Sequence, residues 1–194
     1  MGRQWLPATA CLFVALLVSG CANPPNKEMD QAQGAIDAAA AAGASRYATS
    51  EYSAATDALK NATAAVAARD HRLALNYALD SREHAQNAAR AAADAKASVR
   101  VEVDRAMAEI TTLVKQGRLR LATAERARPP SRLLKQPADD LAAADAALQE
   151  AGEAIAAADY LAARAALEGV KEQVETALAA IDAAISGRAR QRRG

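Results

Sequence analysis

Large apolar residues recur every seven positions in two parts of an otherwise alanine-rich chain. In the first series, alanine occupies the second apolar position of each heptad, as at Ala55 and Ala62. A seam that alternates one large and one small side chain is typical of closely packed antiparallel helices. The two series, in chain order, are Tyr52, Leu59 and Val66, and then Leu141, Leu148 and Ile155.

Helix-breaking residues divide this pattern into five expected helices. Their ranges are 28–42, 51–68, 71–126, a helix from near Pro137, and a last helix from Asp159 to Gly187. The third would span roughly 80 Å if unbroken, at 1.5 Å per residue, with Gly117 as its weak point. The last carries a strong seam with steps of three and four: Leu167, Val170, Val174, Leu178, Ile181 and Ile185. The predicted fold is all-α: an elongated antiparallel helical bundle of about five helices.

The pattern repeats when the chain is shifted by 89 residues. Tyr52 then aligns with Leu141, and Asp70, an expected helix cap, aligns with Asp159. We therefore predict two related helical hairpins joined by a long central helix, each forming a three-helix bundle with one end of it. The alternative is two unrelated hairpins of similar composition.

The first 25 residues have the layout of a bacterial export signal. Arg3 precedes an apolar run over 6–18, which is too short to span a bilayer, and Pro24 and Pro25 follow. The predicted organisation is a signal peptide (1–20), a tether (21–27), a first alanine-rich helical region (28–127), a second hairpin packed on the end of the long helix (128–187) and a basic disordered tail (188–194).

The end of this signal resembles the lipobox of bacterial lipoproteins. Val18-Ser19-Gly20-Cys21 places an aliphatic residue and two small residues before a cysteine. The resemblance implies cleavage between Gly20 and Cys21 and a lipid on the Cys21 thiol. Ala22 in the next position implies the cell outer membrane, with the body facing the periplasm. The alternative is an ordinary signal peptide with a chance cysteine.

Composition limits what the body can do. Alanine makes up 57 of 194 residues, and 24 basic residues nearly balance 23 acidic ones. Few large side chains are available for a thick core, whereas alanine is the best helix former. A balanced charge with few aromatic residues does not favour nucleic acid as a partner. Cys11 leaves with the signal, so no disulfide is expected in the body.

No catalytic constellation emerges from the sequence, so we expect neither an enzyme nor a cofactor. His71 and His84 lie on one predicted helix, about 220° apart at 100° per residue, so they cannot share a metal ion. Asp139 and Asp140 suit the positive end of a helix better than acid–base chemistry. Pairs four residues apart within one helix are expected for Asp80 with His84, Arg164 with Glu168 and Lys171 with Glu175.

The C-terminal arginines are the candidate contact with an anionic surface, either lipid headgroups or peptidoglycan. They are Arg188, Arg190, Arg192 and Arg193. The alternative is a solvated end that only favours the C-terminus of the last helix.

Residues 35–96 resemble an alanine-rich domain-of-unknown-function family of bacterial envelope lipoproteins. The resemblance rests on Ala35-Ile36, Gly43-Ala44, Tyr47-Ala48, Leu59 and Asp70. Members often precede an OmpA-like peptidoglycan-binding domain, and the resemblance implies an envelope location but no activity.

These observations predict a non-catalytic, lipid-anchored envelope protein that serves as a helical spacer or as a docking module for another envelope protein. The alternative is a structural, self-assembling or wall-associated outer-membrane lipoprotein. A lipid-handling binder is the third interpretation, and the scarcity of large apolar residues weakens it.

Overall fold

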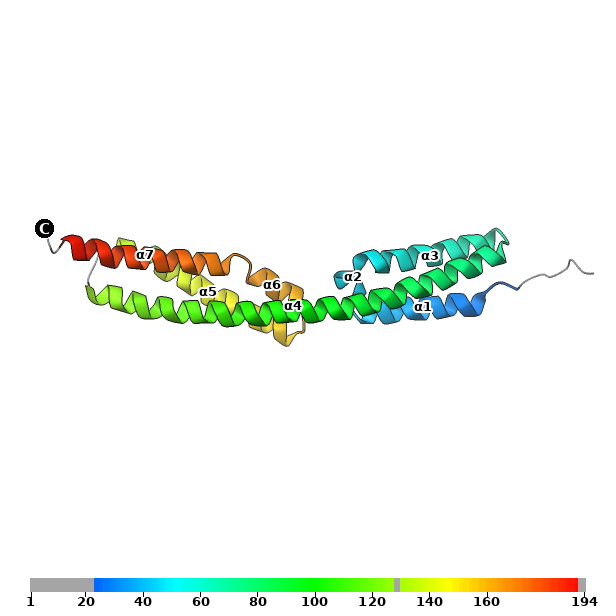
Figure 1. Ribbon diagram of the computed structural model, residues 1–194, viewed down its shortest axis with the longest axis horizontal. Helices are drawn as coiled ribbons and strands as arrows, with labels where there is room; N and C mark the ends of the chain where they lie inside the picture. Colours follow the sequence, from blue (N-terminus) through cyan, green and yellow to red (C-terminus); the bar gives the residue numbers. More distant parts are fainter. Residues whose placement is uncertain (1–22, 128–129, 192–194) are drawn as a thin grey trace, which may run out of the picture. The chain divides into compact units, whose positions relative to one another are not determined.

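The chain folds into α-helices throughout the part that the structure describes. The computed structural model describes residues 23–127 and 130–191, and these ranges contain seven helices and no strand. In chain order the helices are α1 (Asn26–Ala41), α2 (Ala44–Tyr47), α3 (Thr49–Ala67), α4 (His71–Ala127), α5 (Arg132–Ala156), α6 (Tyr160–Ala166) and α7 (Val170–Gln191) (Figure 1). The all-α prediction and the long central helix are confirmed.

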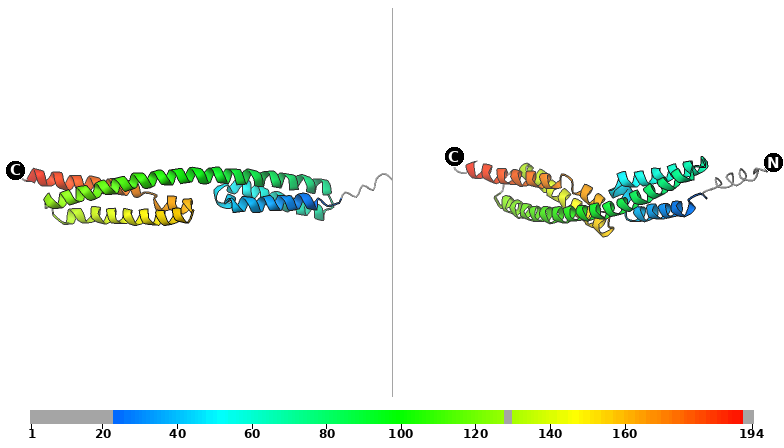
Figure 2. Two further views of the ribbon diagram at one scale, coloured as in Figure 1. Left: turned by 90° about the horizontal axis from the view of Figure 1, so that it is seen from below. Right: turned by 45° about the vertical axis from the view of Figure 1, so that its right-hand side comes forward.

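The described helices group into two compact units that divide between Ala93 and Asp94, inside α4. Unit 1 contains α1, α2, α3 and the first part of α4. Unit 2 contains the rest of α4 with α5, α6 and α7. Figure 2 shows α1 and α3 alongside the first part of α4, and α5 and α7 alongside its later part. The predicted regions 28–127 and 128–187 divide at the end of the long helix. The two compact units divide within that helix.

Unit 1 has a core of alanine. Its fully buried positions come from all three long helices, and Ile36 is the one larger aliphatic residue among the buried hydrophobic residues described there. Ala39 and Ala44 pack with Ala88 and Ala92, with Tyr47 and Tyr52 half-buried around them. The large residues of the predicted seam therefore flank the core, and the alanines occupy its centre.

A buried hydroxyl bridges two helices of unit 1. Ser81 in α4 is completely buried, and its Oγ donates a 2.7 Å hydrogen bond to the backbone carbonyl of Ala55 in α3. A serine Oγ lies only one bond beyond Cβ, so this contact requires the two backbones to be close. The bond satisfies a polar group that would otherwise be buried without a partner.

Unit 2 has a core of larger aliphatic residues. Val103 and Ile110 from α4 are buried with Leu141 from α5 and with Val174 and Ile181 from α7. All of the predicted seam of the last helix is buried except Ile185, which is half-buried. The sequence pattern thus identified the contribution of the last helix to this core, whereas Leu148 and Ile155 of the predicted α5 series are only half-buried.

Gly117 is a packing residue and not the predicted weak point of the long helix. α4 passes through it without a break, and a Cβ added there would lie 2.6 Å from Cδ2 of Leu141 in α5. Glycine at this position lets the leucine side chain approach the backbone of α4.

The turns that close the two hairpins match at the predicted offset of 89 residues. Arg69 and Ala158 both have positive φ, 61° and 57°. Asp70 Oδ1 accepts from Leu73 N at 2.9 Å, and Asp159 Oδ1 accepts from Ala162 N at 3.1 Å.

The backbone bonds of these turns correspond as well. Asp70 N donates to Ala65 O, and Asp159 N donates to Ala154 O, both at 2.9 Å. Each turn is therefore a helix-ending Schellman motif whose last residue caps the next helix. The predicted relation between the two hairpins holds in detail at these turns.

Several predicted helix boundaries are wrong, and α2 lies between the expected helices 28–42 and 51–68, where no helix was predicted. The expected fifth helix is divided into α6 and α7, because Gly169 adopts a left-handed φ of 75° that ends a helix. α5 begins five residues before Pro137, because burial of Leu134 on the core extends the helix past the proline. α7 passes through Gly187 to Gln191, since a single glycine costs a helix only about 1 kcal/mol, so residues 188–191 of the predicted disordered tail are helical.

Candidate functional site

The residues predicted to carry function lie largely outside the described part of the chain. Gly20 and Cys21 precede its first residue, Asn23, while Arg192 and Arg193 follow its last. Arg188 and Arg190 belong to the backbone of α7, but their side chains fall outside what is described. The lipidation site and the anionic-surface contact therefore remain predictions.

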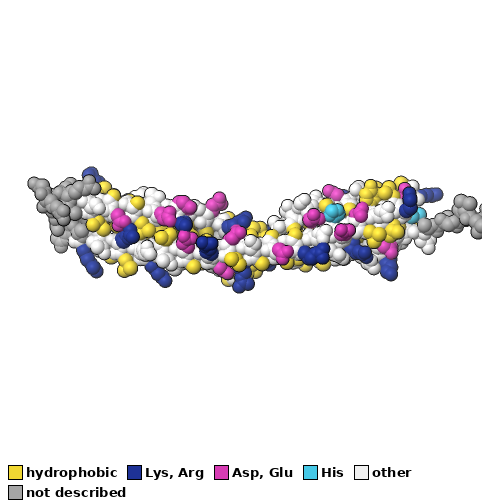
Figure 3. Space-filling view, viewed as in Figure 1, with side chains coloured by type: hydrophobic (Ala, Val, Ile, Leu, Met, Phe, Trp, Pro, Cys, Tyr) yellow, Lys and Arg dark blue, Asp and Glu magenta, His cyan; other side chains and the backbone are white. Residues whose placement is uncertain are grey.

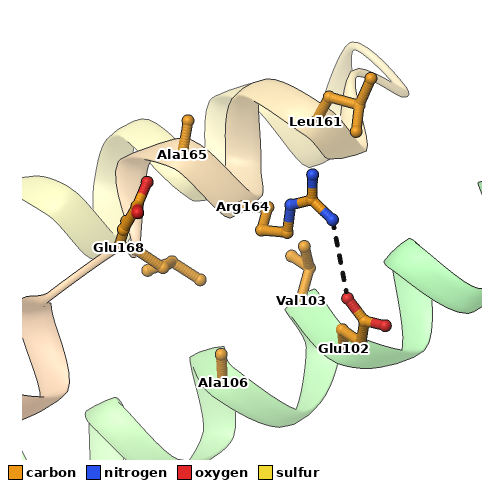
Figure 4. A pocket seen from close by; sticks show the side chains of 8 residues that line it. Glu102, Val103, Ala106, Leu161, Arg164, Ala165 and Glu168 are labelled. Carbon is orange, nitrogen blue, oxygen red and sulfur yellow. Dashed lines mark ion pairs between the residues drawn. The ribbon is translucent and has the colours of Figure 1, made fainter. Parts of the chain in front are cut away.

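A groove in unit 2 is lined by both apolar and charged side chains. It has a volume of about 520 Å³ and lies between α4 and α6. Figure 4 shows Val103 and Ala106 on the α4 side, opposite Leu161 and Ala165 of α6. The complete lining is Glu102, Val103, Ala106, Leu161, Arg164, Ala165, Leu167 and Glu168.

The break between α6 and α7 accompanies this groove. Leu167 and Glu168 form the link between the two helices, and both line the groove. At the equivalent positions of unit 1, Ala78 and Leu79, α4 is continuous. The sequence reasoning missed this site. The available signal was Gly169, which interrupts the apolar seam between Leu167 and Val170.

The rim of the groove carries more negative than positive charge. Arg164 and Glu102 face each other across it, with Nη1 and Oε2 3.9 Å apart (Figure 4). The Glu168 side chain is exposed and makes no ion pair or hydrogen bond within the described part of the chain. The rim thus has two carboxylates and one guanidinium, which leaves it suited to a basic group.

Tyr160 precedes Leu161, a lining residue of the groove, and makes cation–π contacts with two basic side chains. The Lys96 ammonium lies 6.0 Å from the centroid of the Tyr160 ring, and the Arg100 guanidinium lies 5.9 Å from it. Contacts of this length at a partly exposed site stabilise by about 0.5–1 kcal/mol. Both cations come from α4, so the ring holds the start of α6 against α4.

Cations predicted to pair within their own helices instead bridge to α4. Lys171 Nζ lies 2.6 Å from Glu109 Oε1, and Arg164 pairs with Glu102 and not with Glu168. The hydrogen bond from Lys171 holds the pKa of Glu109 below its usual range, and the same bond raises the pKa of Lys171. Glu175 also raises the pKa of Lys171, as a smaller contribution than Glu109.

Among the residues of unit 2 that the structure describes, two further ion pairs join α4 to its neighbours. Arg118 pairs with Asp145 of α5, and Arg120 pairs with Asp182 of α7. These long side chains emerge beside a neighbouring helix, which the sequence pattern alone does not reveal.

The histidines of unit 1 also differ from expectation in their partners. His84 Nδ1 lies 2.8 Å from Glu51 Oε2 of α3, whereas Asp80 had been expected as its partner. His71 has a buried Nδ1 with no hydrogen-bond partner among the described residues. No group of three or more metal-ligating side chains occurs in residues 23–127 and 130–191.

The acidic pair Asp139 and Asp140 lies well inside α5, which begins at Arg132, so its predicted place at the positive end of a helix is wrong. Asp140 Oδ1 accepts from Gln136 Nε2 at 2.9 Å and from Gln173 Nε2 at 3.2 Å. The second bond links α5 to α7. Asp140 thus joins two helices through its side chain, and the charge of a helix end plays no part in this contact.

The surface offers mixed charge. Figure 3 shows Lys and Arg side chains interspersed with Asp and Glu on the visible face of each unit. Among the described helices, none combines the length and the apolar character needed to cross a bilayer.

Comparisons with protein-family models, with curated proteins and with solved structures found no match for this chain.

Proposed function

We propose that this protein is a non-catalytic lipoprotein of the bacterial cell envelope, anchored in the outer membrane by lipid on Cys21. The observation that carries the proposal is the complete export layout ending in Val18-Ser19-Gly20-Cys21. A single acyl chain gives only marginal membrane binding, whereas two or more give a stable anchor. The helical body would then be held in the periplasm close to the bilayer.

Within this function, the groove between α4 and α6 is the proposed docking surface for another envelope protein. Its floor of Val103, Ala106 and Leu161 fits an aliphatic side chain. Its rim, with Glu102 and Glu168 against Arg164, fits a neighbouring lysine or arginine. The proposed partner segment therefore presents an aliphatic residue beside a basic one.

Lipidation is tested by growing cells with labelled palmitate and by mass spectrometry of the N-terminal peptide. The expected result is label on the wild-type protein, an N-terminus at Cys21, and no label on the Cys21→Ser variant. A wild-type protein that carries no lipid at residue 21 would overturn the anchoring proposal.

Docking is tested with a photo-crosslinking amino acid placed at Ala165 or at Ala162. Both residues are exposed on α6, but only Ala165 lines the groove. We expect one crosslinked envelope protein from position 165 and none from position 162. Equal crosslinking from both positions would contradict a specific groove.

Self-assembly is the second candidate function, and exposed apolar side chains of unit 2 favour it. Val101 is 67% exposed and Leu119 is 72% exposed. Sedimentation velocity of the lipidated protein in detergent separates the two candidates. A species that grows with protein concentration, and that Leu119→Gln disperses, would favour assembly over docking.

A further inference from the structure

The chain enters unit 1 beside a shallow depression of about 500 Å³. Two segments distant in sequence form it, namely the first described residues and the first turns of α4. The lining comprises Asn23, Pro24, Pro25, Glu28, His71, Arg72 and Leu75. The turn between α3 and α4 is therefore next to the start of α1.

The entry of the chain at this depression is fixed by local structure. Pro25 is buried, and its carbonyl accepts from Met29 N at 3.0 Å. Asn26 N donates to Pro24 O at 2.8 Å. Proline also restricts φ to about −65°. The direction from which the tether approaches is thus set by ordered residues.

The proposed lipid anchor lies very close to this entry point. Two peptide units separate Cys21 from Asn23, so their Cα atoms are at most about 7 Å apart. Asn23 lines the depression. If Cys21 carries lipid, as the proposed function requires, this end of unit 1 must lie at the level of the phospholipid headgroups.

The side chains of the depression match one kind of headgroup. The Arg72 side chain is exposed and has no ion pair or hydrogen bond within the described ranges. Its guanidinium can bind a phosphate through two parallel hydrogen bonds. The neighbouring His71 has a buried Nδ1 that no described protein group satisfies.

Glu28 adds a carboxylate to the same depression. A purely anionic ligand would be repelled by it. A headgroup that carries a phosphate and an ammonium would engage both charges, the phosphate at Arg72 and the ammonium at Glu28. The tether raises the effective concentration of headgroups to the millimolar range, so a weak site would be filled.

We propose that this end of unit 1 rests on the membrane and that the depression binds the phosphoethanolamine headgroup of a phospholipid. Leu73, 40% exposed two residues from His71, lies in the same turn of α4 and can contact the acyl–headgroup boundary. The inference rests on the proposed lipid anchor and adds an orientation and a ligand to it.

Orientation is tested with the lipidated full chain in vesicles of phosphatidylethanolamine and phosphatidylglycerol that contain a nitroxide-headgroup lipid. A fluorophore is attached at Ala68→Cys or at Thr49→Cys, since the Cys21 thioether does not react with maleimide. Both positions are exposed and lie at opposite ends of α3, about 28 Å apart. We expect strong quenching at position 68 and several-fold weaker quenching at position 49.

The ligand is tested by titrating the lipidated protein in detergent with dihexanoylphosphatidylethanolamine, using the probe at position 68. Arg72→Gln should weaken binding about fivefold, which corresponds to about 1 kcal/mol. Arg69→Gln is the matched control, because Arg69 belongs to the same turn but does not line the depression. Dihexanoylphosphatidylglycerol should bind more weakly than the ethanolamine lipid, and Glu28→Gln should remove this preference.

Each negative result has a distinct meaning. Lipid on Cys21 with equal quenching at positions 68 and 49 overturns the inference and leaves the anchor intact. Equal losses for Arg72→Gln and Arg69→Gln show general surface charge and overturn the headgroup site. Absence of lipid on Cys21 overturns the proposed function and, with it, this inference. Circular dichroism of each variant verifies that unit 1 remains folded.

Discussion

Units 1 and 2 share the turns that close their hairpins and differ in what fills their cores. At the 89-residue offset, Ala85 in unit 1 corresponds to Val174 in unit 2, and Ala92 corresponds to Ile181. All four residues are fully buried. The same backbone motif thus supports an alanine core in one unit and an aliphatic core in the other.

The comparison shows two ways to stabilise a three-helix unit. Small side chains in unit 1 let backbones approach until a serine hydroxyl reaches a carbonyl. Larger side chains in unit 2 bury more apolar area per residue, at about 25 cal/mol per Å². Unit 2 also ties its other helices to α4 with ion pairs such as Lys171–Glu109.

The largest expected effect comes from emptying the core of unit 2. Ile181→Ala removes a completely buried side chain and leaves a cavity, which should destabilise unit 2 by about 2–5 kcal/mol. Hydrogen exchange measures this as lost protection of α7 amides. Unchanged protection would show that unit 2 has no tightly packed core at this position.

The reciprocal change should overfill unit 1. Ala92→Ile adds three carbons among Ala39, Ala44 and Ala88, all fully buried. Overpacking should cost about 1–3 kcal/mol and reduce protection of α1 and α4 amides. Ala91→Ile, at an exposed position one residue away, is the control and should have little effect.

Two glycines test whether a helix needs glycine for close packing against a neighbouring side chain or merely tolerates it. Gly117→Ala in unit 2 would place a Cβ against buried Leu141 and should destabilise by about 1 kcal/mol after the gain in helix propensity. Gly34→Ala in α1 meets nothing within 4 Å and should stabilise by about 0.5–1 kcal/mol. Thermal unfolding of the two variants should therefore shift in opposite directions.

The equivalent turns should respond alike. Asp70→Ala and Asp159→Ala each remove one helix cap, and each should cost about 1 kcal/mol. Asparagine at either position retains an acceptor oxygen and should restore most of the loss. A large difference between the two turns in urea unfolding would contradict their equivalence.

The smallest expected effect is the pH dependence of the stability of unit 2. Because the pKa of Glu109 is lowered, its contribution is present above its usual value of 4.5 and is lost as pH falls through the lowered pKa. Because the pKa of Lys171 is raised, its contribution is present below its usual value of 10.5 and is lost as pH rises through the raised pKa.

Lys171→Met should therefore lower the melting temperature slightly between these pH values and have no effect in strong acid. The reduction should be small because both groups are exposed and screened by salt. Lys115→Met is the control, because it removes an exposed lysine of α4 whose side chain has no ion pair among the described residues. An equal reduction in both variants would show that net charge matters and the pair does not.

Much of the fold follows from local sequence signals. Gly43, with a φ of 88°, separates α1 from α2 by backbone geometry, and seams such as Val174–Leu178–Ile181 identify buried faces. Asp70 and Asp159 were recognisable as caps because a carboxylate can accept from the first free N–H groups of a helix. These features depend on neighbours within a few residues.

The groove and the ion pairs depend on tertiary structure and could not be predicted in the same way. Whether Gly169 ends a helix or is tolerated, as Gly187 is, depends on what packs around it. Lys171 has acidic residues both on its own helix and on α4, and only the packing decides that Glu109 lies at 2.6 Å. His84 finds Glu51 by the same kind of contact.

The hydrogen bond of Ser81 has a consequence for how the first hairpin finds its alignment. A strip of identical methyl groups offers nearly the same fit when one helix slides past another by a full turn. Ala74, Ala78, Ala85 and Ala88 form such a strip on α4, and Ser81 interrupts it. In a shifted alignment, the buried Ser81 hydroxyl would lose its hydrogen bond to the Ala55 carbonyl, which costs free energy. A single polar residue can therefore select one alignment of the helices among several similar ones.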